Sequence, residues 1–150
     1  MGILMAEATE AEREWCAQLM AGSEPWITLR RGLEQCRAVC GRADLRLLVA
    51  HEGGVLCGFV LLHPRGVAGS PYIASIAVDP QWRGKGVGSR MLEHVEGLSA
   101  SRWIFLCVSS FNAAARRLYE RHGYRQVGEF ADYVIDGASE ILMQKRLDRA

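Results

Sequence analysis

The sequence lacks a strong net charge. Its 150 residues carry 18 Lys or Arg side chains against 17 Asp or Glu, a formal charge of +1 at pH 7, and 16 of the 18 cations are arginine. Proteins that hold nucleic acid through its phosphates are typically strongly basic. The charge balance therefore does not favour a nucleic-acid partner.

Long apolar runs and paired cysteines are also missing. The longest apolar run, residues 55–62, contains a glycine and is too short to cross a bilayer, so we expect no membrane partner. The five cysteines form no C-x-x-C pair, which argues against a disulfide framework and favours a reducing compartment. No basic segment precedes an apolar one at the start, so no signal peptide is predicted. We expect a cytoplasmic protein.

What is present suits one packed core. Apolar residues make up 49% of the chain, and the length predicts a single domain over residues 1–150. Apolar residues at helical spacing predict four helices: 7–20, 28–40, 87–98 and 112–122. Apolar or alternating runs bounded by turn residues predict six strands: 45–51, 55–62, 72–78, 103–108, 124–131 and 140–147.

Turn and cap residues predict how these elements begin and connect. Gly53-Gly54 is expected to close a hairpin, and residues 64–71 are expected to form a loop. Thr9 and Glu12 have the spacing of a capping box, and Thr28 is expected to cap the second helix.

The order of the elements predicts a mixed sheet. A strand, a helix and a second strand succeed one another between residues 72 and 108, and a right-handed crossover of this kind makes its two strands parallel. The hairpins elsewhere imply antiparallel neighbours. The predicted fold class is α/β (α+β), with a mostly antiparallel, twisted sheet of six to seven strands and about four helices.

The segment DPQWRGKGVGSR, residues 79–90, connects a predicted strand to a predicted helix. Its three glycines at alternate positions let successive backbone N–H groups point toward one centre at a helix N-terminus, and Arg83 and Lys85 add charge. This pattern is typical of a phosphate-binding loop. The segment contains no Walker A run, Gly-x-x-x-x-Gly-Lys-Ser/Thr. The dinucleotide fingerprint fails too, because Ser89 or Met91 stands where its last glycine belongs. A glycine-rich turn without a ligand stays the alternative.

Together with a later segment, this loop resembles the GNAT superfamily of acyl-CoA-dependent N-acetyltransferases. The family's central motif, Arg/Gln-x-x-Gly-x-Gly/Ala, is matched by Arg83, Gly86 and Gly88 after a strand that ends in IAVDP. Its second cofactor motif is matched by NAAARRLYERHGY, residues 112–124. The resemblance covers nearly the whole chain and is closest in look to the protein N-terminal (ribosomal-protein alanine) acetyltransferases.

This resemblance implies a binding site for acetyl-CoA. The pyrophosphate is expected on the loop residues Arg83, Gly84, Lys85, Gly86, Val87, Gly88 and Ser89. In the family a bulged strand splays from its parallel neighbour, here 72–78 from 103–108, and the pantetheine arm pairs with the exposed edge at Ile76, Ala77 and Val78. An amide there, of Val78 or a neighbour, is expected to bind the thioester oxygen. Asn112 is expected to contact the arm, and Tyr119 to face the sulfur.

The implied reaction is direct attack of a neutral amine on the thioester in a ternary complex, with no covalent enzyme intermediate. Tyr119 is the expected catalytic acid for the leaving thiolate, since a phenol has a pKa near ~10 against roughly 8.5 for a thiol. Periodicity alone favours a core aromatic at this position, and the family match favours the catalytic role.

The sequence leaves the catalytic base open. In the N-terminal acetyltransferase branch a glutamate often stands where this chain has Cys107. Glu52, Asp79 and Glu140, reached through water, are the alternatives. Without a Cys-His-Asp arrangement, Cys107 is expected to be a buried structural thiol. The histidines have no metal-ligand spacing, so we predict no metal.

The acceptor site implied by the resemblance lies opposite the donor, between residues 23–28 and 132–137. Trp26 and Tyr133 are the expected substrate contacts, with Phe111 and Tyr72 behind them, although core packing explains such aromatics equally well. The predicted function is acetyl transfer to a primary amine, either a small molecule or a protein N-terminus. A non-catalytic acyl-CoA-binding module is the alternative, and the resemblance implies a homodimer as a possible assembly, because many family members dimerise.

Overall fold

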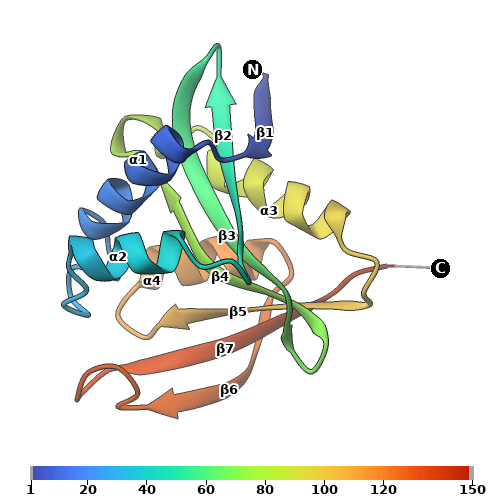
Figure 1. Cartoon of the computed structure of the whole chain (residues 1–150). Coiled ribbons are helices and arrows are strands. Elements are labelled where there is room, and N and C mark those ends of the chain that lie inside the picture. Colours follow the sequence, from blue (N-terminus) through green and yellow to red (C-terminus); the bar gives the residue numbers. More distant parts are fainter. Residues whose placement is uncertain (1, 149–150) are drawn as a thin grey trace.

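A computed structural model describes residues 2–148 as a single seven-stranded sheet with helices on both faces (Figure 1). The strands lie in the order β1-β2-β3-β4-β5-β7-β6. Their bounds are β1 Ile3–Glu7, β2 Arg46–Glu52, β3 Val55–Val67, β4 Ser70–Val78, β5 Trp103–Ser109, β6 Arg125–Ala131 and β7 Ser139–Arg146. The α-helices are α1 Glu10–Ala21, α2 Leu33–Cys40, α3 Val87–Leu98 and α4 Ala113–Arg121, and a short 3₁₀ helix, η1, spans Pro80–Trp82.

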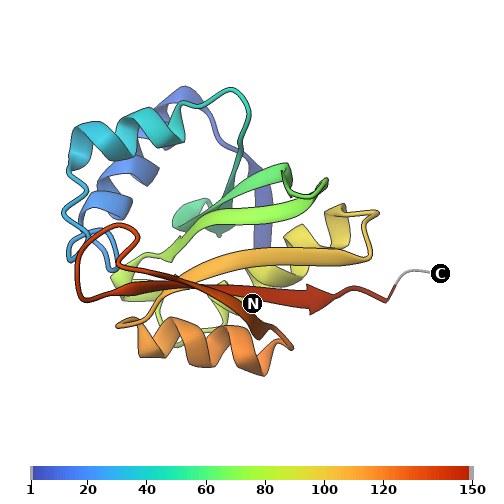
Figure 2. The same cartoon turned by 90° about the horizontal axis from the view of Figure 1, so that it is seen from below.

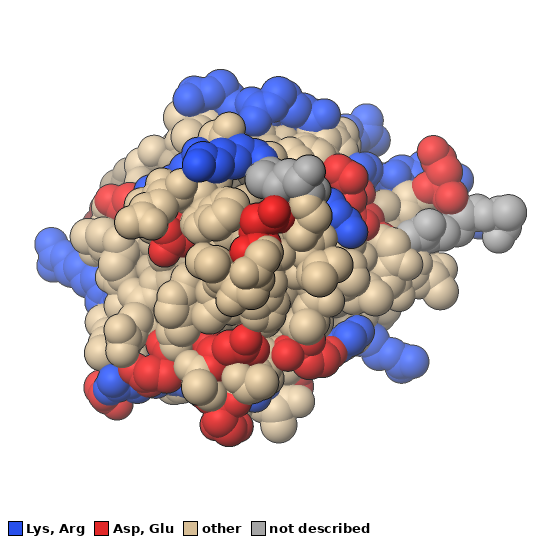
Figure 3. All heavy atoms as spheres, turned by 90° about the horizontal axis from the view of Figure 1, so that it is seen from above, with Lys and Arg blue, Asp and Glu red and all other residues tan. Residues whose placement is uncertain are grey.

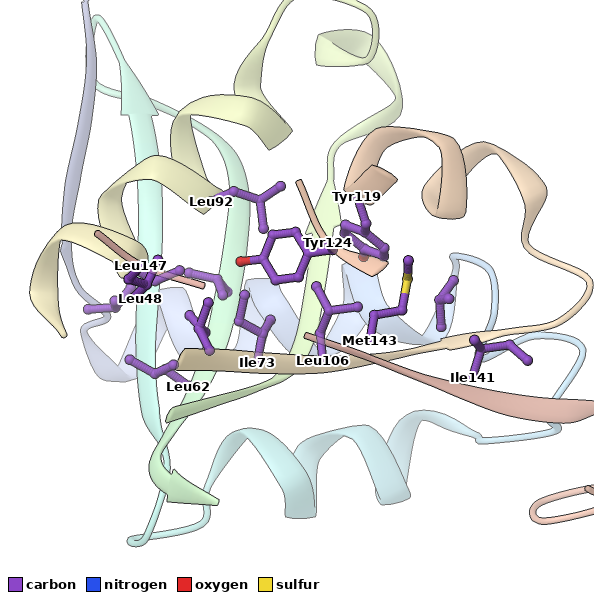
Figure 4. Close-up of a cluster of buried hydrophobic side chains, with 14 residues drawn as sticks. Leu48, Leu62, Ile73, Leu92, Leu106, Tyr119, Tyr124, Ile141, Met143 and Leu147 are labelled. Atoms are coloured by element: carbon purple, nitrogen blue, oxygen red, sulfur yellow. The ribbon is translucent and has the colours of Figure 1, made fainter. Parts of the chain in front are cut away.

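Two helices pack on each face of the sheet (Figure 2). The core under α3 and α4 takes every second residue of the central strands, and Figure 4 shows Leu92 and Tyr119 from the two helices over Leu106 and Met143. The core under α1 and α2 takes the alternate residues, among them Phe59 and Leu61 of β3. β3 is therefore apolar on both faces, as expected for a central strand. None of the described helices is long and apolar enough to span a membrane.

All neighbouring strands are antiparallel except β4 and β5, as the crossover rule predicts. This parallel pairing is very short, because only Tyr72↔Phe105 and Ile73↔Leu106 are partners. The register of β4 against β3 shifts directly afterwards, which leaves Ala74 as a bulge. A bulge bends its strand and increases the twist. β4 and β5 therefore separate toward their carboxyl ends, and the predicted fold class is confirmed.

The residues that cap α1 and α4 are the ones predicted, but α1 begins later than predicted. The Thr9 hydroxyl accepts a hydrogen bond from the Glu12 amide at 3.2 Å, and the Glu12 carboxylate accepts one from the Thr9 amide at 3.0 Å. This capping box starts α1 at Glu10, three residues after the predicted start at residue 7. Asn112 starts α4 as predicted, with its Oδ1 accepting from the Ala115 amide at 3.5 Å.

The prediction for the start of the second helix is wrong. α2 begins at Leu33 with Gly32 as its cap, because the Thr28 amide and hydroxyl both bind the Glu24 carboxylate within a preceding turn. That turn also contains Arg30 in the left-handed region, at φ 60°. A residue in this conformation cannot continue a right-handed helix, so the helical pattern of residues 28–32 is not used.

Two further predictions fail at the sheet. β1 was not among the predicted strands: its sequence ILMAE is apolar, but the strand has only five residues and lies at the sheet edge with Leu4 70% exposed. Residues 64–71, predicted as a loop, mostly extend β3 and β4 around a tight turn at Ala68 and Gly69. Pro64 is tolerated in β3 because the ladder is interrupted between His63 and Val67.

A buried polar group joins α3 to the second half of the sheet. The Tyr124 hydroxyl donates to Glu96 Oε2 and Lys145 Nζ donates to Glu96 Oε1, each at 2.9 Å. Glu96 and Tyr124 are both buried. Burial and the Glu96 charge raise the pKa of the Tyr124 phenol, so it stays a donor at neutral pH.

We predict that Tyr124→Phe lowers the free energy of unfolding by about 1–3 kcal/mol, because a charge-assisted hydrogen bond of a buried carboxylate is lost. Urea unfolding measures this. Tyr133→Phe is the control, since that side chain is 69% exposed and should leave stability unchanged. Equal stability of the two variants would contradict a stabilising role for the Tyr124–Glu96 bond.

Candidate active site

The separation of β4 and β5 opens a cleft of about 1190 Å³. Its walls come from both sides of the sheet: the segment after α1, part of α2, the diverging strands, the glycine loop, the start of α3, α4 and the β6–β7 loop. A cleft that passes between two strands of a sheet can receive one molecule from each face. The structure therefore offers two adjoining sites, which we call the donor side, toward α3 and α4, and the acceptor side, toward α1 and α2.

The donor side contains a row of backbone donors. Within the described residues, the amides of residues 84–89 form no hydrogen bond to the protein, and the first helical bond of α3 runs from the Arg90 amide to the Gly86 carbonyl at 3.0 Å. Gly84 and Gly86 adopt the left-handed region, at φ 74° and 83°. Six successive free N–H groups at a helix N-terminus form an anion-binding site.

Cationic side chains surround this row. Seen from above, Lys and Arg gather along the edge of the molecule on the α3–α4 side, and Asp and Glu gather along the opposite edge (Figure 3). The cations of the loop, α3 and α4 are Arg83, Lys85, Arg90, Arg116, Arg117 and Arg121. A charge of +1 thus hides an uneven distribution, in which cations outnumber carboxylates along the loop, α3 and α4. The basic side suits a phosphate-bearing ligand.

Not every predicted loop residue reaches the cleft. Lys85 is absent from the lining, and its Nζ lies 5.5 Å from the centre of the Trp82 ring. Arg83 lines the cleft, with its Nε donating to the Val78 carbonyl at 3.1 Å. The Ser89 hydroxyl pairs with His122 Nε2 at 2.8 Å and thereby connects the loop to the end of α4.

The strand edge predicted for the pantetheine arm borders the cleft. Ile76, Ala77 and Val78 pair with β3 on one side, and β5 offers them no partner on the other. A strand edge of this kind presents N–H and C=O groups that no neighbouring strand pairs with, although the Val78 carbonyl accepts from Arg83 Nε. An extended amide-containing chain can pair with it as an added strand would.

Tyr119 closes the donor side from α4. It is buried, packs edge-on against Tyr124 with ring centres 6.1 Å apart, and lines the cleft. Its hydroxyl has no hydrogen-bond partner among the described residues. Burial raises the pKa of this phenol, so it keeps its proton at neutral pH. Asn112 also lines the cleft, beside the start of α4.

Four polar side chains from three different strands lie together on the acceptor side. Tyr72 of β4, Cys107 and Ser109 of β5, and Glu140 of β7 all line the cleft. The Ser109 hydroxyl donates to Glu140 Oε2 at 2.6 Å. Burial raises the pKa of both the Tyr72 phenol and the Cys107 thiol; the hydrogen bond from Tyr72 lowers that of Cys107, and the Glu140 charge raises both. Cys107 was expected to be a buried structural thiol, but it is only partly buried and lines the cleft. Its net raised pKa leaves it a neutral thiol and gives no sign of an activated nucleophile.

Three of the four aromatic residues predicted for the acceptor site line the cleft, and one does not. Trp26, Tyr72 and Tyr133 line the cleft, whereas Phe111 lies outside its lining and is 39% exposed. Phe130 of β6, not predicted, lies beside Tyr133 with ring centres 5.4 Å apart and lines the cleft instead. The expectation that Phe111 lies behind the substrate contacts is therefore wrong, because this residue does not line the cleft.

Two of the alternative bases lie outside the cleft. Glu52 is absent from the lining, and its Oε2 is buried without a hydrogen-bond partner. Asp79 caps η1 by accepting from the Gln81 amide at 3.0 Å. Within residues 2–148, no group of three or more His, Cys, Asp or Glu side chains is arranged to hold a metal ion, and the five cysteines are free thiols.

Comparison with known proteins identifies the family. The Acetyltransferase (GNAT) family matches residues 7–124, so the chain belongs to this family and is an N-acetyltransferase. It is 26% identical to N-alpha-acetyltransferase RimI of Mycobacterium tuberculosis, over 95% of this chain and 92% of that protein. It is 32% identical to the IAA acetyltransferase of Azospirillum brasilense, over 71% of each chain.

Solved structures agree on the fold. The ribosomal-protein-S18-alanine N-acetyltransferase of Escherichia coli superposes with a TM-score of 0.77 at 20% identity, over 99% of this chain and 96% of that one. An aminoglycoside 6′-N-acetyltransferase complexed with coenzyme A superposes with a TM-score of 0.75 at 16% identity, over 98% of each chain.

We predict that Gly86→Ala abolishes most of the thermal stabilisation by coenzyme A, because the left-handed backbone that aims the amides becomes strained. Gly69→Ala is a matched control: both glycines have φ 83° and open space around the added carbon, but Gly69 lies in the β3–β4 turn. Each substitution should cost about 1–2 kcal/mol of stability.

Thermal unfolding with acetyl-CoA, CoA and NAD measures the effect on binding. A ligand at 100 times its dissociation constant contributes about 2.7 kcal/mol, which is roughly 5–10 °C at this chain length. We expect CoA species, but not NAD, to stabilise the wild type and Gly69→Ala. An equal response of the Gly86 and Gly69 variants to CoA would contradict the assignment of the loop.

Proposed function

We propose that this protein transfers the acetyl group of acetyl-CoA to a primary amine by direct attack within a ternary complex. The observation that carries the proposal is a run of six free backbone amides, five of whose residues line the cleft, beside an open strand edge. The amides suit a pyrophosphate, and the edge suits the amide groups of a pantetheine arm. The coenzyme A complex of a structural neighbour supports this donor.

Each donor-side residue has a role in the proposed reaction. The amides of residues 84–89 bind the pyrophosphate, while the Arg83 amide donates to the Pro80 carbonyl; a backbone amide at the end of β4, at or near Val78, binds the thioester oxygen as negative charge develops on it. Asn112 contacts the pantetheine arm. Tyr119, which lines the cleft from α4, gives its proton to the leaving thiolate.

The proposed acceptor is the α-amino group of a peptide. An α-amino group has a pKa near ~8 and is partly neutral at pH 7, so it needs less help from a base than a lysine side chain near ~10.4. The names of the Mycobacterium tuberculosis relative and of the Escherichia coli structure support this acceptor class. The aminoglycoside enzyme among the structural neighbours keeps a small amine as the second candidate.

The test is CoA release by the purified protein with lysine-free peptides of different first residues and with a panel of small amines. Acetylation of any of them, located by mass spectrometry, supports the enzyme. CoA binding without turnover on the whole panel would favour the alternative, a non-catalytic acyl-CoA-binding module.

We predict that Tyr119→Phe lowers kcat by about 10²–10⁴-fold while acetyl-CoA affinity stays nearly constant, because only the proton for the thiolate is lost. Steady-state kinetics and the acetyl-CoA thermal shift measure the two effects. Tyr124→Phe is the control, because its ring neighbours Tyr119 but its hydroxyl binds Glu96. An unchanged kcat for Tyr119→Phe would remove this tyrosine from the mechanism.

A further inference from the structure

Glu140 occupies a place that the proposed mechanism leaves unused. It lies opposite Ser109 in the β5–β7 register, and that serine is only 2% exposed. The Ser109 hydroxyl holds Oε2 at 2.6 Å, while Oε1 accepts no hydrogen bond from any described residue. The side chain lines the cleft on its acceptor side. One oxygen is thus fixed and the other is free to bind a ligand.

The other candidate carboxylates either have both oxygens hydrogen-bonded or lie outside the cleft. Glu24 is the second carboxylate in the described lining, and its two oxygens accept from the Thr28 amide at 3.0 Å and the Thr28 hydroxyl at 2.7 Å. Glu52 and Asp79 do not line the cleft. Of the two carboxylates in the described lining, Glu140 is therefore the one with an oxygen that accepts no hydrogen bond, and it lies on the sheet.

The neighbours of Glu140 cannot replace it as a proton acceptor. Tyr72 and Cys107 face the same space, and burial together with the Glu140 charge raises the pKa of each. Both therefore keep their protons at neutral pH. They can donate or pack against an acceptor, but they have no charge with which to attract an ammonium group.

We infer that Glu140 binds the ammonium group of the acceptor and takes its proton, and that Ser109 is a positioning residue that holds the carboxylate in place. The inference rests on the proposed N-acetyltransfer and names the base that the sequence leaves open. It also explains how the chain can use Cys107 where related enzymes often have a glutamate: the carboxylate comes from the neighbouring strand β7 instead.

The proposed acetyl transfer accounts for every proton and bond. One proton passes from the ammonium nitrogen to Glu140 Oε1 and on to water, and the free lone pair then forms the bond from nitrogen to the thioester carbon. The nitrogen loses a second proton to water as the C–S bond breaks. The thiolate takes a proton from Tyr119, which regains one from water. An ammonium and a thioester become an amide and a thiol, with one proton released.

Several polar, titratable or charged groups line the cleft together with Glu140. They are Tyr72 on β4, Cys107 and Ser109 on β5, Tyr133 in the β6–β7 loop and, toward α1 and α2, Glu24, Arg31 and Arg42. Arg42 is paired with Asp44. Because Tyr72 and Cys107 keep their protons at neutral pH, the charges on the acceptor side that act on an ammonium group are those of Glu140, Glu24, Arg31 and Arg42.

The test compares the pH dependence of kcat/KM in wild type and Glu140→Gln, with an alanine-starting, lysine-free peptide or another acceptor found active. We expect a loss of about 10²–10⁴-fold at pH 7. The loss should grow by up to tenfold per pH unit below the acceptor's pKa, because the variant must wait for a neutral amine. An unchanged acetyl-CoA thermal shift shows that the variant is folded and binds the donor.

Glu129→Gln is the matched control. The Ser139 hydroxyl donates to Glu129 Oε2 at 2.6 Å, the same serine–carboxylate geometry, but this pair lies outside the cleft lining. We expect its pH profile to follow the wild type. Ser109→Ala should lower kcat/KM for the acceptor but leave the acetyl-CoA thermal shift unchanged, because the carboxylate loses the donor that holds it in place; a purely structural role would change both.

A second measurement tests the geometry without catalysis. Cys107 should react faster with iodoacetamide in Glu140→Gln than in wild type at pH 8, and mass spectrometry identifies the modified thiol. If wild type acetylates an amine and Glu140→Gln matches its pH profile, the role of Glu140 is overturned while the proposed function stands. If wild type acetylates no amine of the panel, the proposed function fails, and the role of Glu140 fails with it.

Discussion

The active site depends on a parallel pairing that stops after two residue pairs. β4 is held by β3 on its other side, and β5 is held by β7, so neither strand can move to close the gap without breaking a full ladder. The bulge at Ala74 turns β4 away where the pairing ends. The gap is therefore a fixed opening through the sheet, and the two core layers on either side place different chemistry at its two mouths.

Long and regular apolar patterns made much of the fold predictable. α3 falls at the predicted residues because five apolar side chains recur at helical spacing, and β5 ends within one residue of its prediction. β1 was not predicted, because a five-residue edge strand buries little. The predicted start of α2 was wrong, because Thr28 binds Glu24 in a turn. Local hydrogen bonds of this kind compete with helix formation and leave no periodic trace.

The two halves of the site differ in how far the sequence reveals them. The donor half rests on residues 84–89, which are neighbours in the chain, so their glycine spacing is readable directly. The acceptor half joins Tyr72, Cys107 and Glu140 from three strands, and it exists only once β5 has chosen its register against β4 and β7. A slip of one residue would turn each side chain to the other face, and no local pattern in the sequence fixes that choice.

The donors of the glycine loop belong to the main chain, which has a consequence for how this sequence can diverge. Every residue type except proline carries an N–H group, so replacing a side chain in the loop does not delete a donor. Only proline, or a side chain that cannot adopt the left-handed backbone of Gly84 and Gly86, removes the cradle. Substitutions can therefore change the acceptor side one side chain at a time, while the loop amides that bind the proposed acyl donor are retained.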